Sequence, residues 1–191
     1  MQRVIRSMGF ILVTAMMLTL LVGVVATQDE VVLVVGIEQE PEQINPLSTM
    51  SFAAYIESFH ARDLWEWDNA RTAIPVMAAA IPSVEDGTAG LTDEGNTWVE
   101  VTIREGLFWS DGVPITAASC EPYHNILMNR DLSANIGRGV YPDVIESFEI
   151  VDDLTFRLTY NSFFPDFVGA TSSGAIATCF YPGHILQAML D

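Results

Sequence analysis

The 191-residue sequence contains no lysine, and its eight basic residues are all arginines. This absence excludes two classes of chemistry, because a Walker-type phosphate loop and a pyridoxal Schiff base both need a lysine amine. The 25 acidic residues give a formal net charge of −17. Binding to nucleic acid or to anionic lipid is disfavoured, because attraction to phosphate requires clustered basic side chains. We interpret the acidity as a source of solubility outside the cell.

Histidine and cysteine are also scarce. His60, His124 and His184 are the three histidines, and none of them lies in a His-Glu-x-x-His pattern. Cys120 and His124 are four residues apart on a predicted helix, which is a metal-ligand spacing, but two ligands do not make a site. We instead interpret the pair as structural, with a half-buried cysteine beside a polar histidine. The sequence therefore predicts no metal and no cofactor.

Catalytic patterns are weak. Residues 169–174 read GATSSG, which has the wrong spacing for a Gly-x-Ser-x-Gly elbow, and Ser172 and Ser173 fit a loop. Glu38, Glu40 and Glu42 form a cluster, but a paired acid and base would need one carboxyl in an apolar pocket. A solvated charged loop explains the cluster more simply. We therefore predict that the protein is not an enzyme.

The N-terminus has the three parts of a secretory signal. Arg3 and Arg6 precede an uncharged run over residues 7–28, and Val24 and Ala26 are small enough for a signal-peptidase site. We predict a signal peptide over residues 1–26, cleaved after Ala26. The alternative is an uncleaved membrane anchor, since the apolar run approaches the spanning minimum of about 17 residues.

The remaining chain is long enough for the core of one ordinary domain. Cys120 and Cys179 make an even count, so a disulfide is permitted in an exported protein. Neither their spacing nor their local sequence demands it, because the two cysteines must also lie close in space. Pairing is left open at this point.

Several segments have the pattern of β-strands. Residues 31–37 (VVLVVGI) are β-branched and predict a buried strand. Residues 97–104 alternate strictly, with Val99, Val101 and Ile103 on the buried face. Residues 147–151 and 154–160 flank an acidic turn and predict a hairpin, whose buried face carries five apolar residues: Phe148, Ile150, Phe156, Leu158 and Tyr160. A further strand is predicted over residues 175–181.

Helical patterns lie between these strands. We predict an amphipathic helix within residues 50–67, a second from Thr116 or Ser119 to about residue 129, a third near Pro165 and a terminal helix opened by residues 182–184. Pro122 would be tolerated if Ser119 is the cap and would bend the helix if Thr116 is. Strands and helices that mix without βαβ regularity indicate an α/β (mixed α+β) fold.

Five stretches together resemble the family-5 solute-binding proteins, the peptide- and nickel-binding components of ABC importers. They are residues 34–47 (VVGIEQEPEQINPL), 98–117 (WVEVTIREGLFWSDGVPITA), 151–158 (VDDLTFRL), 164–167 (FPDF) and 182–186 (PGHIL). The second is the most specific, since it resembles the family's Arg-x-Gly, aromatic, Asp-Gly-x-Pro and Thr-Ala pattern. Its aromatic residues Trp98, Phe108 and Trp109 are interpreted as packing within a small subdomain.

The resemblance implies the N-terminal part of a periplasmic-binding-protein type II-like fold, whose two lobes close on a ligand. Residues 27–191 would supply the first lobe and a small subdomain, with the second lobe missing. The implied partners are a peptide or other small solute and the ABC permease subunits, with membrane contact only through the N-terminus or the permease. The implied ligand contacts follow the Asn-Pro loop: Thr49, Met50, Ser51, Phe52 and Tyr55.

Each of these contacts has a structural alternative. Ser51 is also suited to cap the following helix, and Phe52 and Tyr55 are equally suited to a core. Two other functions stay open at this level. One is a truncated or non-transport exported interaction domain of the same fold, and the other is a secreted hydrolase.

Overall fold

The computed structural model describes residues 32–38, 40, 56, 59, 62–129, 143–171, 179 and 181–190. The chain divides into two compact units, residues 1–38 and 39–191. In the first unit, residues 32–38 have no regular secondary structure, and their apolar side chains are 40–85% exposed. The predicted buried strand over residues 31–37 is therefore wrong for the described residues. β-Branched residues make a strand only where a neighbouring strand accepts their backbone hydrogen bonds, and none of the described strands does so.

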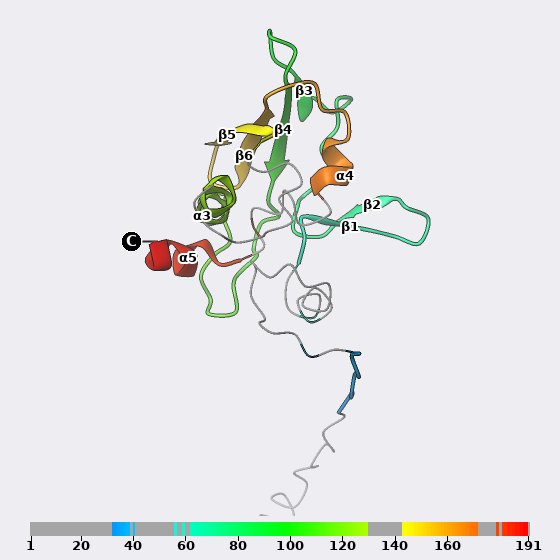
Figure 1. Ribbon diagram of the computed structural model, residues 1–191, viewed down its shortest axis with the longest axis vertical. Coiled ribbons are helices and arrows are strands. Elements are labelled where there is room, and N and C mark those ends of the chain that lie inside the picture. The colour runs from blue at the N-terminus through cyan, green and yellow to red at the C-terminus, as the bar shows by residue number, and fades with distance from the viewer. Residues whose placement is uncertain are drawn as a thin grey trace, which may run out of the picture. The chain divides into compact units, whose positions relative to one another are not determined.

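Two short strands open the described part of the second unit. β1 (Trp65–Trp67) pairs antiparallel with β2 (Ala73–Pro75), and the two extend as a hairpin arm (Figure 1). The sequence predicted an amphipathic helix within residues 50–67, whereas residues 65–67 of that range are strand. Pairing with a strand eight residues away overrides the local apolar spacing, because strand formation depends on its partner more than on propensity.

A four-stranded antiparallel sheet forms the centre of this unit. Its order is β3-β4-β6-β5, from β3 (Ala89–Leu91), β4 (Thr97–Thr102), β5 (Ile145–Ile150) and β6 (Thr155–Tyr160). The register places Val99 opposite Leu158 and Val101 opposite Phe156, and all four side chains are buried. The predicted alternation and the predicted hairpin are both confirmed. β3 has no counterpart among the strands that the sequence predicted.

One residue of the predicted buried face is not buried. Phe148 is partly buried and stacks on Phe156, with ring centroids 5.0 Å apart. Ile150, in contrast, is 46% exposed. Ile150 is the last residue of β5, which is an edge strand of the sheet.

Three described helices accompany the sheet: α3 (Ala117–Met128), α4 (Phe167–Thr171) and α5 (Gly183–Leu190). Thr116 is the cap of α3, and its amide donates to Ser119 Oγ at 3.1 Å. Pro122 therefore lies inside the helix, where it cannot donate to the preceding turn. No helix in the described ranges is long and apolar enough to cross a membrane.

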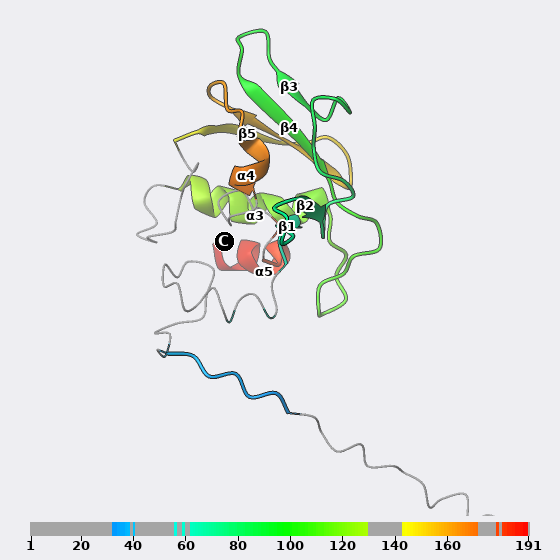
Figure 2. The same cartoon turned by 90° about the vertical axis from the view of Figure 1, so that its right-hand side faces the viewer.

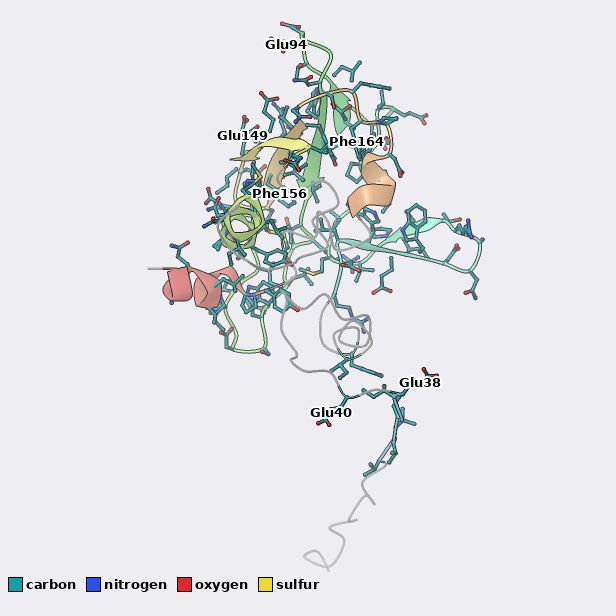
Figure 3. The ribbon with its side chains drawn as sticks, in the orientation of Figure 1. Glu38, Glu40, Glu94, Glu149, Phe156 and Phe164 are labelled. Atoms are coloured by element: carbon teal, nitrogen blue, oxygen red, sulfur yellow. A yellow bond between two sulfur atoms is a disulfide. The ribbon has the colours of Figure 1, made fainter. Side chains whose placement is uncertain are left out.

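α3 lies between the sheet and α5 (Figures 1 and 2). Phe156 faces this sheet–helix core and is fully buried (Figure 3). The core continues through Leu64 and Trp65 of the segment that leads into the arm. A single apolar cluster thus connects the arm, the sheet and α3.

A disulfide joins Cys120 of α3 to Cys179, which precedes α5. Both residues are fully buried. The pairing that the sequence only permitted is therefore present, because the fold brings two residues 59 apart in sequence to adjacent positions.

Gly183, the first residue of α5, marks a close approach between helices. A Cβ atom at this position would overlap the backbone carbonyl oxygen of Ser119. We expect Gly183→Ala to lower the free energy of unfolding by about 1–3 kcal/mol, because a backbone atom cannot move aside as a flexible side chain can. Urea unfolding followed by circular dichroism measures this. Gly36→Ala, where the added Cβ meets open space, is the control, and equal midpoints for the two variants would contradict the close approach.

Candidate functional site

The five residues predicted to contact ligand, Thr49, Met50, Ser51, Phe52 and Tyr55, lie outside the residues that the structure describes. The first continuously described stretch after them begins at Arg62 and leads into β1. This stretch is firmly held. The Leu64 carbonyl accepts hydrogen bonds from the amides of Val76 and Ala78 at 3.0 and 2.9 Å. Any group it carries therefore has a fixed position relative to the core.

Trp65 strengthens this attachment. Its side chain is fully buried, and its indole Nε1 donates to the Val168 carbonyl oxygen of α4 at 3.1 Å. A buried indole needs such a partner, because an unsatisfied N–H in an apolar environment is costly. The start of the arm is thus anchored both to the core and to α4.

Asp63 lies directly before these anchors and is an unusual group. The side chain is partly buried, and its Oδ1 atom is fully withdrawn from solvent without a hydrogen-bond partner among the described residues. Burial first, and then the negative charge of Glu66, raises the pKa of the Asp63 carboxyl to about 6. Sequence reasoning missed this residue, because neither spacing nor composition reveals how deeply one carboxyl is buried.

The raised pKa predicts that Asp63→Asn stabilises the protein at neutral pH. The folded-state pKa of about 6 exceeds the ordinary value of 3.8, so the folded state loses stability as the pH rises from about 4 to 6. Ionised Asp63 should cost about 1–2 kcal/mol at pH 8, after a discount for the exposed part of the side chain. Thermal unfolding at pH 8 and at pH 4 measures this, and a gain that is equal at both pH values would refute the assignment.

His124 is buried in the sheet–helix core and is 6% exposed. Its ring lies 5.1 Å from the ring of Phe148, and burial lowers the pKa of the imidazole to about 4. The sequence raised Cys120 and His124 as a pair with metal-ligand spacing. Cys120 is instead bonded to Cys179, so its sulfur is not a thiolate ligand. Within the described ranges, no three His, Cys, Asp or Glu side chains are placed to share a metal ion.

His184 joins α5 to the loop between β4 and α3, residues 103–116, which we call the motif loop. Its Nε2 atom lies 2.7 Å from Asp111 Oδ2, and the pair is partly exposed. The hydrogen bond from His184, followed by that from the Val113 amide, lowers the pKa of the Asp111 carboxyl. Asp111 lies in the Asp-Gly turn that the sequence singled out, so the turn and the terminal helix are coupled through one polar contact.

The three aromatic residues of the 98–117 motif, Trp98, Phe108 and Trp109, lie in different environments. Trp98 packs under the Arg157 guanidinium, 4.8 Å from the ring centroid, and Arg157 Nε donates to Glu100 Oε1 at 3.1 Å. Trp109 packs against the apolar core, as predicted. Phe108 is 60% exposed, so its predicted packing role is wrong. It lies in the loop that is closed by the antiparallel Phe108–Pro114 bridge.

The remaining residues that the sequence raised as candidates form no catalytic or metal-binding cluster among the described positions. Glu38 and Glu40 are exposed (Figure 3), as a solvated loop requires, and Glu42 is outside the described residues. Residues 169–171 belong to α4, whereas Ser172 and Ser173 are not described. His60 is not described either.

Comparison with solved structures identifies the fold. The oligopeptide-binding protein of Thermus thermophilus, solved with a pentapeptide, superposes with a TM-score of 0.64 at 21% identity over 77% of this chain and 24% of that protein. AppA of Bacillus subtilis, solved with a nonapeptide, gives a TM-score of 0.61 at 21% identity over 78% of this chain and 27% of that protein. The mixed α/β arrangement is thus that of part of a periplasmic binding protein.

Sequence comparison identifies the family. Protein XP55 of Streptomyces lividans is 33% identical over 94 residues, which are 49% of this chain and 16% of that protein. The chain therefore spans 16–27% of the length of these three proteins. The model of bacterial extracellular solute-binding proteins, family 5 Middle, matches residues 73–181. These residues include β2, the central sheet, the motif loop, α3 and both cysteines. The chain belongs to the family-5 bacterial extracellular solute-binding proteins.

Proposed function

We propose that the protein is the substrate-binding component of an ABC import system. It captures peptides or similar small solutes outside the cytoplasmic membrane and delivers them to the permease, without making or breaking a bond. Membership of the family through residues 73–181 is the observation that carries this proposal. The buried Cys120–Cys179 disulfide supports it, because such bonds persist in oxidising compartments outside the cytoplasm.

Peptides are the solutes we favour. The Thermus and Bacillus proteins were solved with a pentapeptide and a nonapeptide. Recognition through the peptide backbone would let one site accept many side chains. We propose that Thr49, Met50, Ser51, Phe52 and Tyr55 supply backbone and side-chain contacts at the edge of the cleft. Capture would proceed by closure of two lobes about a hinge, with the described sheet and helices in the first lobe.

Residues 27–191 would form the exported part. We propose that residues 1–26 are a signal peptide cut after Ala26, and N-terminal sequencing of the exported protein tests this. A mature N-terminus at Thr27 is expected. Recovery of the uncut chain in the membrane fraction would instead assign this segment as an anchor.

Isothermal titration with peptides of three to nine residues tests the binding function. We expect saturable heat with at least some of these peptides and no cleavage of them by mass spectrometry. Ser51→Gly together with Phe52→Ala should weaken binding about tenfold or more, whereas Phe108→Ala, at an exposed position away from the core, should not. The absence of heat with every peptide would overturn the proposal, and turnover of a peptide would replace it with an enzymatic one.

A further inference from the structure

Two Asp-Gly pairs, at residues 86–87 and 111–112, lie in exposed turns. Gly87 and Gly112 have φ angles of 72° and 87°, and a Cβ atom at either position would meet open space. A glycine after an aspartate leaves its own amide nitrogen unhindered, because it has no side chain. That nitrogen can then reach the carboxyl carbon of the aspartate, so both pairs are candidate sites of a spontaneous covalent change.

The change is isomerisation of aspartate to isoaspartate. The glycine nitrogen bonds to the aspartate Cγ atom, a Cγ–O bond breaks, and the oxygen leaves as water with the carboxyl proton and the amide proton. Water then opens the five-membered succinimide at the main-chain carbonyl, so that the chain continues through the former side chain. No oxidant or reductant takes part. Because the oxygen leaves as water, the protonated carboxyl reacts and the carboxylate does not.

The glycine amides are held in the same way in the two turns. Gly87 donates to the Val84 carbonyl oxygen at 3.2 Å, and Gly112 donates to the Trp109 carbonyl oxygen at 2.9 Å. Each bond joins residues three apart, so it breaks whenever its own turn opens. A difference in reactivity between the two pairs must therefore come from their carboxyl groups.

The Asp111 carboxylate is held at both oxygens. Oδ2 lies 2.7 Å from His184 Nε2, and Oδ1 accepts a hydrogen bond from the Val113 amide at 3.1 Å. Contacts of this kind favour the ionised form and lower the pKa of the Asp111 carboxyl. His184 belongs to α5, 73 residues away in sequence, so its contact does not depend on the turn being closed.

The Asp86 carboxyl is held only from within its own turn. Its Oδ2 atom accepts a hydrogen bond from the Ser83 hydroxyl at 2.7 Å, and the Asp86 amide donates back to that hydroxyl at 3.0 Å. This partner is neutral and three residues away, so it is lost together with the turn when the turn opens. Nothing comparable to His184 then keeps the carboxyl ionised and in place.

We propose that Asp86 is a site of spontaneous isomerisation and that the contact with His184 protects Asp111 from the same reaction, a difference that does not depend on the proposed solute-binding function. An isoaspartate at residue 111 would carry its carboxylate directly on the Cα atom, and the contact with His184 would be lost. Protection of Asp111 therefore preserves the link between the motif loop and α5.

Incubation of the purified protein at pH 6 and 37 °C tests this proposal. Because the chain has no lysine, trypsin cuts only after arginine and places the two pairs in separate peptides, residues 72–104 and 105–130. Electron-transfer fragmentation in a mass spectrometer then distinguishes isoaspartate from aspartate. We expect isoaspartate to accumulate severalfold faster at residue 86 than at residue 111. Synthetic peptides of residues 80–92 and 106–116, in which both turns are free, should convert at similar rates.

Three variants separate the causes. Asp86→Glu should abolish the isoaspartate in the first peptide, since a glutamate cannot close the five-membered ring. His184→Ala should raise the rate at residue 111 severalfold and leave the rate at residue 86 unchanged. Ile185→Ala, at the adjacent exposed position of α5, is the matched control and should change neither rate.

Two results would overturn the proposal. If both pairs of the wild-type protein stay unconverted while the free peptides react, the turns themselves protect both residues, and Asp86 is not a site. If His184→Ala, shown by circular dichroism to be folded, isomerises at residue 111 no faster than the wild-type protein, His184 does not protect Asp111.

Discussion

Removal of the Cys120–Cys179 disulfide should lower the free energy of unfolding by about 3–4 kcal/mol. The bond closes a loop between residues 59 apart, and the chain-entropy relation for a loop of that size gives about 4 kcal/mol, at the upper end of typical measured values. For a chain of this length, the loss corresponds to a fall in the melting temperature of about 10 °C. The variant is Cys120→Ala with Cys179→Ala, which avoids leaving a buried hydroxyl in place of either sulfur.

Reductant supplies the control for this experiment. The wild-type protein should melt like the double variant in the presence of a dithiol, and the variant itself should not respond to it. Because both cysteines are fully buried, reduction should be slow in the folded protein and fast once it is unfolded. Equal melting temperatures for the oxidised wild-type protein and the variant would show that α3 and α5 are held together without the bond.

Local patterns predicted the central sheet well. The alternation of Val99, Val101 and Ile103 set which side of β4 is buried, and the acidic turn at Asp152 and Asp153 set the β5–β6 hairpin. Both are decided by residues close in sequence, since a two-residue period allows only one buried face. The cap of α3 was predicted only as a choice between Thr116 and Ser119, because each hydroxyl suits the position.

Features that depend on distant partners were not predictable. β1 exists because residues 73–75 pair with it, and the apolar run over residues 31–37 has no strand beside it in the described residues. Likewise, the cysteines are brought together by the packing of α3 against α5. In each case the sequence shows the residues but not the neighbour that decides their environment.

The candidate site likewise contains residues that the sequence indicated and one residue that it did not. Residues 49–55 were predicted from motifs shared with a known family, and no physical property of these residues alone indicated them. Asp63 was invisible to both approaches, because its character comes from burial and from the position of Glu66. A carboxyl three residues from another carboxyl is ordinary in sequence, and its significance appears only when one oxygen is found withdrawn from water.

Acid should destabilise the protein through His124. The pKa of its imidazole is about 4 in the folded state against 6.5 for the free side chain. The unfolded state therefore binds a proton first as the pH falls, and stability is lost from about pH 6.5 down to pH 4. The loss should approach about 3 kcal/mol. His124→Gln should remove this contribution, and urea unfolding at pH 7, 5.5 and 4.5 measures it in the Asp63→Asn background.

Asp63 complicates the wild-type profile, because its contribution has the opposite sign over part of the same range. As the pH falls from about 6 to 4, protonation of Asp63 stabilises the folded state while protonation of His124 in the unfolded chain destabilises it. The wild-type protein should therefore show a shallow profile in this window. In the Asp63→Asn variant, the free energy of unfolding should fall steeply with acid, and in the variant that combines Asp63→Asn with His124→Gln its pH profile should be shallow again.

His184→Gln, at a partly exposed ring, serves as the control. Added to Asp63→Asn, it should leave the steep fall with acid in place. If Asp63→Asn does not steepen the profile, the two buried groups do not oppose each other, and the environments assigned to them are wrong.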